Sequence, residues 1–310
     1  MQRYNANNIL YCLVLALIAG CGTGSNTSSN VSNDNDAQTI DYKDDSQDLP
    51  SVEIVVSGSV RDYYIYIPNP SSDNPMPLLY LLNGGSAGRT AFEQQSQFKS
   101  LADREKMVLV VPVGQKLPSN EGAWQLNTDS SSRQDIDYIE AIYNDVASRA
   151  VINANRVYAI GYSLGGMFSY ELACQMSSRF AAIGSLAGSM PVSPSSCDPD
   201  RNVPILHIHG VQDEIIPYSV TWDWKAWDSV GTMSDIPNLI EFWSSRYNCA
   251  QQSINSITST VSYLVQAGCD ESVRVEHYSL QNGTHAWPTS IGGTETVEIL
   301  WSFLSDFSLD

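Results

Sequence analysis

Short apolar runs alternate with longer amphipathic stretches along most of the chain. Continuous apolar runs predict strands buried on both faces of a sheet, and helical periodicity predicts the helices that cover it. Such alternation predicts an α/β fold in one domain, with a mostly parallel central sheet flanked by helices and a ligand site beyond the carboxyl ends of the strands. The predicted strands are 52–56, 60–67 (a hairpin with the first), 78–82, 107–113, 156–160, 181–186, 203–209 and 273–280, and the predicted helices are 91–104, 135–150, 166–176, 238–247 and 295–307.

The segment Gly161-Tyr162-Ser163-Leu164-Gly165-Gly166 joins a predicted strand directly to a predicted helix. A serine at such an elbow has a strained backbone in a very tight turn, so the residues two before and two after it must be small. Gly161 and Gly165 meet this requirement. The bare pattern also arises by chance, and an ordinary turn serine is the alternative. The setting makes Ser163 the candidate nucleophile.

A serine hydroxyl needs a base within hydrogen-bond reach, and a third group must hold that base in the right tautomer. Of the four histidines, His207, His209 and His277 lie in or at the end of predicted strands. His285 alone lies in a loop beyond a strand end, where its side chain can reach a neighbouring site. It is therefore the candidate base, whereas His209 is expected to bridge loops below the site.

The candidate acid is Asp213, which lies just past the strand that ends at His209. A turn-forming or helix-capping role is the alternative, with Glu214 or another acid serving the histidine. The order Ser163, Asp213, His285 is that of α/β-hydrolases and differs from the orders in chymotrypsin-like and subtilisin-like proteases.

Acyl transfer also needs two backbone N–H groups aimed at the oxygen that becomes negative. Leu164, the residue after the nucleophile, supplies one candidate. Gly85, in the glycine-rich loop after strand 78–82, supplies the other, because a glycine lets the main chain come close to a substrate. A flexible glycine turn is the alternative interpretation.

These motifs resemble those of the α/β-hydrolase family that contains extracellular polyhydroxybutyrate depolymerases, feruloyl esterases and acetyl xylan esterases. The resemblance implies the α/β-hydrolase fold and a serine carboxylic-ester hydrolase that needs no metal or organic cofactor. Two positions depart from the family pattern: Asn83 replaces the histidine of a His-Gly pair, and Leu164 stands where many relatives carry a polar residue. The resemblance runs from about residue 60 to the C-terminus and includes 92–96, 101–105, 155–158, 179–182, 203–210 and 284–288.

The predicted substrate is an extracellular ester, either a feruloyl or acetyl ester of plant polysaccharide or a polyhydroxyalkanoate-type polyester. Two alternatives stay open, namely a serine peptidase of the prolyl-oligopeptidase type and a non-catalytic lipoprotein that binds a polymer or glycan. Aromatic side chains suit stacking on a sugar, an aromatic acid or a polymer surface. The candidates are Tyr162, Trp287 and Trp124, followed by Trp222, Trp224 and Trp227, for which core packing is an equal alternative.

The N-terminus carries an apolar stretch, 9–19, that is too short for a comfortable transmembrane helix and is preceded by Arg3. Residues 18–21 at its end read Ile-Ala-Gly-Cys, which looks like a bacterial lipobox with Cys21 as the acylated residue. We therefore predict a lipoprotein signal peptide at 1–20, a lipidated disordered tether at 21–50 and a catalytic domain at 51–310. An ordinary secretory signal is the alternative. Either way the protein is exported, as an outer-membrane or cell-surface lipoprotein or in secreted form.

Four cysteines remain beyond this segment, an even number that suggests two disulfides in an oxidising compartment. Four cysteines permit three pairings. Proximity in sequence and the family resemblance favour Cys174 with Cys197 and Cys249 with Cys269. A zinc site is the competing interpretation, but the cysteines lack the close paired spacing of zinc ligands.

The net charge of −18 and the sequence pI near 4.4 argue against nucleic acid as a partner. Both values fit a neutral ester substrate. The hydrophobic content of 43% is enough for a single domain with a large core, and we expect a monomer.

Overall fold

The computed structural model describes residues 49–69, 72–85, 92, 95–116, 122–128, 133–195, 197–224 and 230–309. All of them belong to one compact unit, Asp45–Asp310. The predicted signal peptide, the lipidation site at Cys21 and nearly all of the predicted tether lie outside the described residues and stay predictions.

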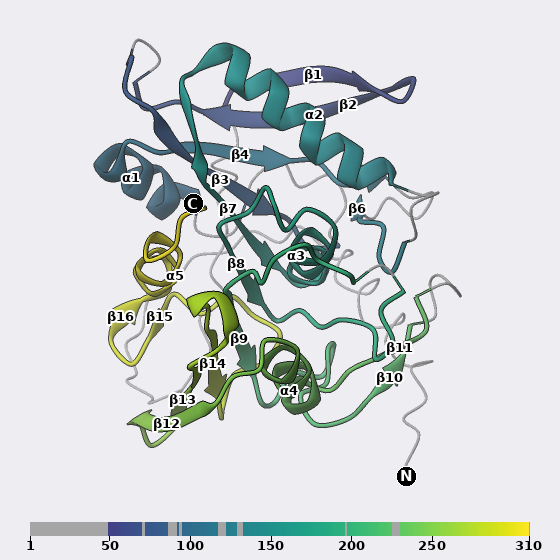
Figure 1. Cartoon of the computed structure of the whole chain (residues 1–310), viewed down its shortest axis with the longest axis vertical. Coiled ribbons are helices and arrows are strands. Elements are labelled where there is room, and N and C mark those ends of the chain that lie inside the picture. Colours follow the sequence, from purple (N-terminus) through teal and green to yellow (C-terminus); the bar gives the residue numbers. More distant parts are fainter. Residues whose placement is uncertain are drawn as a thin grey trace, which may run out of the picture. The chain divides into compact units, whose positions relative to one another are not determined.

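The apolar runs form one sheet to which ten of the described strands contribute. Its members are β1 (Ser51–Val56), β2 (Ser59–Tyr66), β3 (Met76–Leu82), β4 (Val108–Pro112), β7 (Ile152–Tyr162), β8 (Ala182–Leu186), β9 (Ile205–Gly210), β12 (Gln251–Thr258), β13 (Val261–Ala267) and β14 (Val275–Leu280). The order across the sheet is β1-β2-β4-β3-β7-β8-β9-β14-β13-β12 (Figure 1). The parallel part of the sheet consists of β4, β3, β7, β8, β9 and β14, in that order. The antiparallel hairpin of β1 and β2 pairs with β4 at one end, and the hairpin of β12 and β13 pairs with β14 at the other.

Helices cover both faces of this sheet (Figure 1). On one face α2 (Gln134–Arg149), α3 (Leu164–Gln175) and α4 (Ile236–Arg246) contribute to one hydrophobic cluster. On the other face α1 (Gln95–Glu105) and α5 (Thr296–Ser305) contribute to a second cluster. All the predicted strands and helices are present, and the predicted mostly parallel sheet flanked by helices is confirmed.

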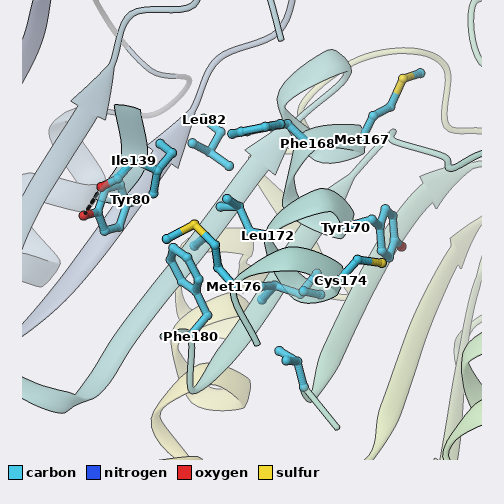
Figure 2. Close-up of a cluster of buried hydrophobic side chains, with 14 of the residues drawn as sticks. Tyr80, Leu82, Ile139, Met167, Phe168, Tyr170, Leu172, Cys174, Met176 and Phe180 are labelled. Atoms are coloured by element: carbon cyan, nitrogen blue, oxygen red, sulfur yellow. Dashed lines mark hydrogen bonds between the residues drawn. The ribbon is translucent and has the colours of Figure 1, made fainter. Parts of the chain in front are cut away.

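Strand β3 shows why a continuous apolar run is needed at the centre of the sheet. Its alternate residues Leu78, Tyr80 and Leu82 belong to the cluster under α3, whereas Leu79 and Leu81 belong to the cluster under α1 and α5. Figure 2 shows the first cluster, in which the Tyr80 hydroxyl donates to the main-chain oxygen of Ile139 at 3.3 Å. The strand is therefore apolar on both faces.

Helix α3 is buried along nearly its whole length, from Leu164 to Cys174. Phe168, Leu172 and other side chains of this helix pack into the cluster of Figure 2. A helix enclosed in this way holds its N-terminus, and therefore the preceding Ser163, in one position.

The hairpin of β12 and β13 was not predicted. Strand β12 reads Gln-Gln-Ser-Ile-Asn-Ser-Ile-Thr, and all of its residues are exposed. It lies at the edge of the sheet and buries little apolar surface, so it lacks the apolar run on which the prediction of strands depended. Three short two-stranded ribbons were also missed: β5 (Gln115–Lys116) with β6 (Gly122–Ala123), β10 (Trp222–Asp223) with β11 (Thr232–Met233), and β15 (Ser290–Ile291) with β16 (Thr294–Glu295).

Two disulfides are present, Cys174–Cys197 and Cys249–Cys269. They are the pairs that sequence proximity and the family resemblance favour. The first ties the end of α3 to the segment after β8, and the second ties the residues after α4 to those after β13. Within the part of the chain that the structure describes, no helix is both long and apolar enough to cross a membrane.

Candidate active site

Ser163 lies at the junction of β7 and α3, with backbone angles φ 56° and ψ −121°. A positive φ is unusual for a residue with a side chain, and here a very tight turn imposes it. A Cβ on Gly161 would lie 2.0 Å from the main-chain oxygen of Gly165, and a Cβ on Gly165 would lie 2.0 Å from that of Leu82. Both positions require glycine because of close backbone approach, as the sequence predicted.

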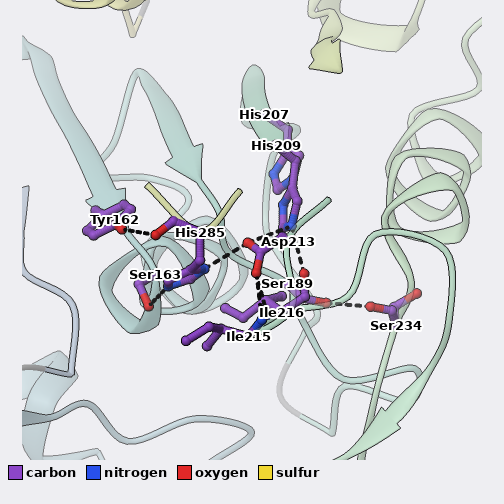
Figure 3. A network of polar contacts seen from close by, with 10 residues as sticks. All are labelled: Tyr162, Ser163, Ser189, His207, His209, Asp213, Ile215, Ile216, Ser234 and His285. Atoms are coloured by element: carbon purple, nitrogen blue, oxygen red, sulfur yellow. Dashed lines mark hydrogen bonds and ion pairs between the residues drawn. The ribbon is translucent and has the colours of Figure 1, made fainter. Parts of the chain in front are cut away.

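The side chains of Ser163, His285 and Asp213 form one hydrogen-bonded line (Figure 3). The Oγ of Ser163 lies 2.8 Å from Nε2 of His285, and Nδ1 of His285 lies 2.7 Å from Oδ2 of Asp213. A carboxylate only accepts, so Nδ1 carries the hydrogen and Nε2 is left to accept from the serine hydroxyl. Glu214, the alternative acid, is exposed. The three predicted residues therefore have the arrangement that activates a serine nucleophile.

The Asp213 side chain is completely buried, whereas that of His285 is 14% exposed. Burial by itself raises the pKa of the Asp213 carboxyl. Hydrogen bonds from His209 and His285, the charge of His285 and the backbone N–H of Ile216 outweigh it, so that the pKa lies well below its usual range. The carboxylate is therefore ionised near neutral pH and can stabilise an imidazolium.

Glycines let the loops that carry Asp213 and His285 approach each other. A Cβ on Gly210 would lie 2.4 Å from the main-chain carbon and oxygen of Gly283. The backbone N–H of Gln212 also donates to the oxygen of Gly283 at 2.9 Å. Sequence reasoning missed this pair, although a glycine just after each of two predicted strands was a visible signal.

Tyr162 contacts the candidate base directly. Its hydroxyl donates to the main-chain oxygen of His285 at 3.0 Å, and the two ring centroids lie 5.5 Å apart (Figure 3). The side chain is only half-buried, so its predicted role in substrate binding stays a prediction.

The two predicted oxyanion donors belong to segments that meet at Ser163. Leu164 begins α3, and the N–H groups of a first helical turn have no partner within the helix. On the other side, a Cβ on Gly84 would lie only 3.1 Å from Cβ of Ser163, and Gly85 follows at once. The roles of Leu164 and Gly85 as donors stay predictions.

The prediction that Trp124 binds substrate is wrong. The residue is 1% exposed, and its indole stacks on Phe168 of α3 with centroids 4.7 Å apart and 10° between the ring planes. Its Nε1–H donates to the main-chain oxygen of Asn83 at 2.9 Å. The indole is covered by protein and cannot stack on a ligand; instead it holds the loop that precedes Gly85.

The prediction that Trp287 binds substrate is also wrong. The residue is 6% exposed, and its ring packs edge-on against Phe92 at 5.3 Å and Phe98 at 6.1 Å. Trp287 follows His285 by only two residues, but its side chain belongs to the second core cluster, although Ala286 between them is exposed. The ring centroids of Trp222 and Trp224 lie 5.4 Å apart, and both side chains pack against the first core cluster. Trp227 lies outside the described residues.

Across the described part of the chain, no group of three or more His, Cys, Asp or Glu side chains is arranged to hold a metal ion. The four cysteines considered as possible zinc ligands are paired in disulfides, so the competing zinc interpretation does not apply to them.

Comparison with known proteins gives a consistent result. Residues 56–243 match the family model described as "Putative esterase". The chain is 25% identical over 259 residues to the bifunctional acetylxylan esterase/xylanase XynS20E of Neocallimastix patriciarum, covering 82% of this chain and 34% of that protein. It is 23% identical over 242 residues to feruloyl esterase B of Piromyces equi, covering 77% and 44%. The chain thus spans about a third to just under half of the length of these relatives.

Solved structures share the fold. The acetyl xylan esterase from Aspergillus awamori superposes with a TM-score of 0.57 at 12% identity, covering 83% of this chain and 99% of that one. A thermostable esterase superposes with a TM-score of 0.53 at 15% identity, covering 85% and 64%. The expected α/β-hydrolase fold is confirmed.

Proposed function

Because the chain belongs to the esterase family, we propose that it is an exported serine hydrolase of carboxylic esters that works through Ser163, His285 and Asp213. The observation that carries the proposal is the unbroken line from the Ser163 hydroxyl through His285 to Asp213, at 2.8 Å and 2.7 Å. The strained backbone of Ser163 at the start of a buried helix supports the same role.

In the proposed mechanism the Ser163 hydroxyl gives its proton to Nε2 of His285 while its oxygen attacks the ester carbonyl. The backbone N–H groups of Leu164 and Gly85 stabilise the oxyanion, and the carboxylate of Asp213 stabilises the imidazolium. His285 then protonates the departing alcohol, which leaves an acyl group on Ser163. A water molecule, deprotonated by His285, attacks this acyl-enzyme and releases the acid.

The proposed substrates are acetyl or feruloyl esters of plant polysaccharide, because the two relatives are named as an acetylxylan esterase and a feruloyl esterase. Acetylated xylan, methyl ferulate and a polyhydroxybutyrate suspension, assayed side by side, separate these substrates from the polyester. If only the polyester releases acid, the proposed polysaccharide ester substrates are wrong.

The catalytic proposal is tested with Ser163→Ala in the full chain and p-nitrophenyl acetate as substrate. We expect hydrolysis to fall by about 10⁴-fold or more, because the nucleophile acts as a unit with its base. In a parallel experiment, a sulfonyl fluoride should add its sulfonyl group to Ser163 of the wild type with loss of fluoride, as seen by peptide mass spectrometry. Equal rates for the two proteins would overturn the assignment of Ser163 as the nucleophile and, with it, the proposed mechanism.

Export is proposed on the lipobox ending at Cys21 and on the two disulfides, which form in oxidising compartments. Cell fractionation tests it: the wild type should be found with membranes, and Cys21→Ala should lose that association. Recovery of the wild type from the cytoplasm would contradict export.

A further inference from the structure

Three imidazoles lie buried behind Asp213, on the side away from Ser163. His207 and His209 come from β9 and His277 from the neighbouring β14, and all three are at most 4% exposed. The ring centroids of His207 and His209 lie 5.2 Å apart, and those of His207 and His277 lie 5.3 Å apart. The mechanism above uses only the fourth histidine of the chain, His285. Histidines in such a position are costly to bury and must be paired.

The nitrogen of His209 that faces the site has two neighbours, both acceptors. Its Nε2 lies 2.9 Å from the main-chain oxygen of Ile216 and 3.3 Å from Oδ2 of Asp213 (Figure 3). A carbonyl and a carboxylate can only accept, so Nε2 carries a hydrogen. Its other nitrogen, Nδ1, lies 3.0 Å from Nε2 of His207, and Nδ1 of His207 lies 2.7 Å from the Tyr170 hydroxyl of α3. A chain of polar groups thus runs from α3 to the carboxylate.

The carboxylate of Asp213 is held from several directions. Its Oδ1 accepts the backbone N–H groups of Ile215 and Ile216, both at 2.8 Å. Its Oδ2 faces Nδ1 of His285 and Nε2 of His209. Ile216 therefore donates to Asp213 through its N–H and accepts from His209 through its carbonyl. The imidazole, one residue of the turn and the carboxylate form a closed ring of contacts.

We propose that His209 is a positioning residue for the reaction, which keeps the Asp213 carboxylate aligned on His285 by binding both that carboxylate and the turn that carries it. The inference rests on the proposed function. The side chains of His209 and Asp213 are both fully buried, so protein groups and not bulk water hold the carboxylate in the intact protein. The hydrogen bond from His209 also helps to keep the pKa of the Asp213 carboxyl low.

The kinetic test compares His209→Leu with His209→Gln in the full chain, using p-nitrophenyl acetate. Leucine removes the N–H at similar size, and we expect kcat to fall by about tenfold or more with KM changed by less than about twofold. Glutamine presents its Nε2–H near the position of the imidazole Nε2, so it should restore most of kcat.

His277→Leu is the matched control, because His277 is equally buried and lies beside His207. It accepts from the Tyr218 hydroxyl at 2.9 Å and donates to the main-chain oxygen of His207 at 3.2 Å. Neither of these hydrogen bonds is made to Asp213 or to the turn that carries it. We expect it to lower the melting temperature as His209→Leu does, but to keep kcat near the wild-type value. Equal losses of kcat in both leucine variants, or no loss in His209→Leu, would overturn the proposal.

Nitrogen-15 NMR of the histidine-labelled wild type gives a second readout that does not depend on turnover, and its first result, whether Nε2 of His209 carries a hydrogen, needs no variant. Four imidazoles give a spectrum simple enough to assign. We expect Nε2 of His209 to carry a hydrogen, and Asp213→Asn to shift that resonance. An unprotonated Nε2, or a resonance unmoved in Asp213→Asn, would overturn the inference. If instead wild type and Ser163→Ala hydrolyse equally, the proposed function fails while the spectrum still decides the contact between His209 and Asp213.

Discussion

At the scale of single residues, the buried Trp124 holds the loop that passes beside the nucleophile Ser163. Its N–H binds the oxygen of Asn83, and a Cβ on Gly165 would come within 2.6 Å of that same oxygen. The carbonyl is thus held between the indole and the elbow. Because Gly84 and Gly85 follow directly, the orientation of this peptide affects where the predicted donor N–H of Gly85 points.

We therefore expect Trp124→Phe to lower kcat for p-nitrophenyl acetate by about tenfold, because phenylalanine keeps the stack on Phe168 but lacks the N–H. Trp243→Phe is the control. Trp243 is fully buried, and its Nε1 has no hydrogen-bond partner among the described residues. A kcat loss of the same size in Trp243→Phe would assign the effect to packing instead.

At the scale of elements, the pairing of β9 with β14 brings the acid and the base together. The two strands are parallel, with Leu280 opposite Gly210. Their following loops therefore leave the sheet at the same edge, side by side. The close approach of Gly210 and Gly283 then sets the separation between these loops.

Gly210→Ala should force these loops apart, because the added Cβ would meet backbone atoms that no side-chain rotation can move. A displacement of about 1 Å at a reacting group can cost about 100-fold in rate, and we expect a loss of kcat of that order. Gly231→Ala is the control: its φ of +77° makes alanine strained, but no atom lies within 4 Å of the added Cβ. Wild-type kcat in a folded Gly210→Ala protein would show that the contact between Gly210 and Gly283 does not determine how Asp213 and His285 are placed.

At the scale of the whole molecule, buried histidines set part of the response to acid. Burial lowers the pKa of His277 to about 3, and it lowers the pKa of His207 well below its ordinary value. In an unfolded chain a histidine titrates near its ordinary value of about 6.5. Between those two values the unfolded chain binds a proton that folded His277 does not, so stability is lost as the pH falls through this window.

For His277 alone the loss is about 1.4 kcal/mol per pH unit below pH 6.5. All other titrating groups act alike on the wild type and on His277→Leu, so the difference between their stability curves isolates the effect of His277. Although less stable at pH 7, this variant should lose stability less steeply between pH 7 and pH 4, as measured by urea unfolding at each pH. Parallel stability curves for the two proteins would show that His277 is protonated in the folded state.

The sequence by itself determined the order of the main strands and helices, the elbow at Ser163 and the identity of the three aligned residues. Those features depend on local patterns, since apolar runs select buried strands and a tight strand-to-helix turn selects small residues. Only the tertiary structure decided that Trp124 and Trp287 are buried, that the polar strand β12 pairs at the sheet edge, and that His209 contacts Asp213. Burial and pairing of this kind depend on which distant segments pack against a residue, and neighbouring sequence carries little of that information.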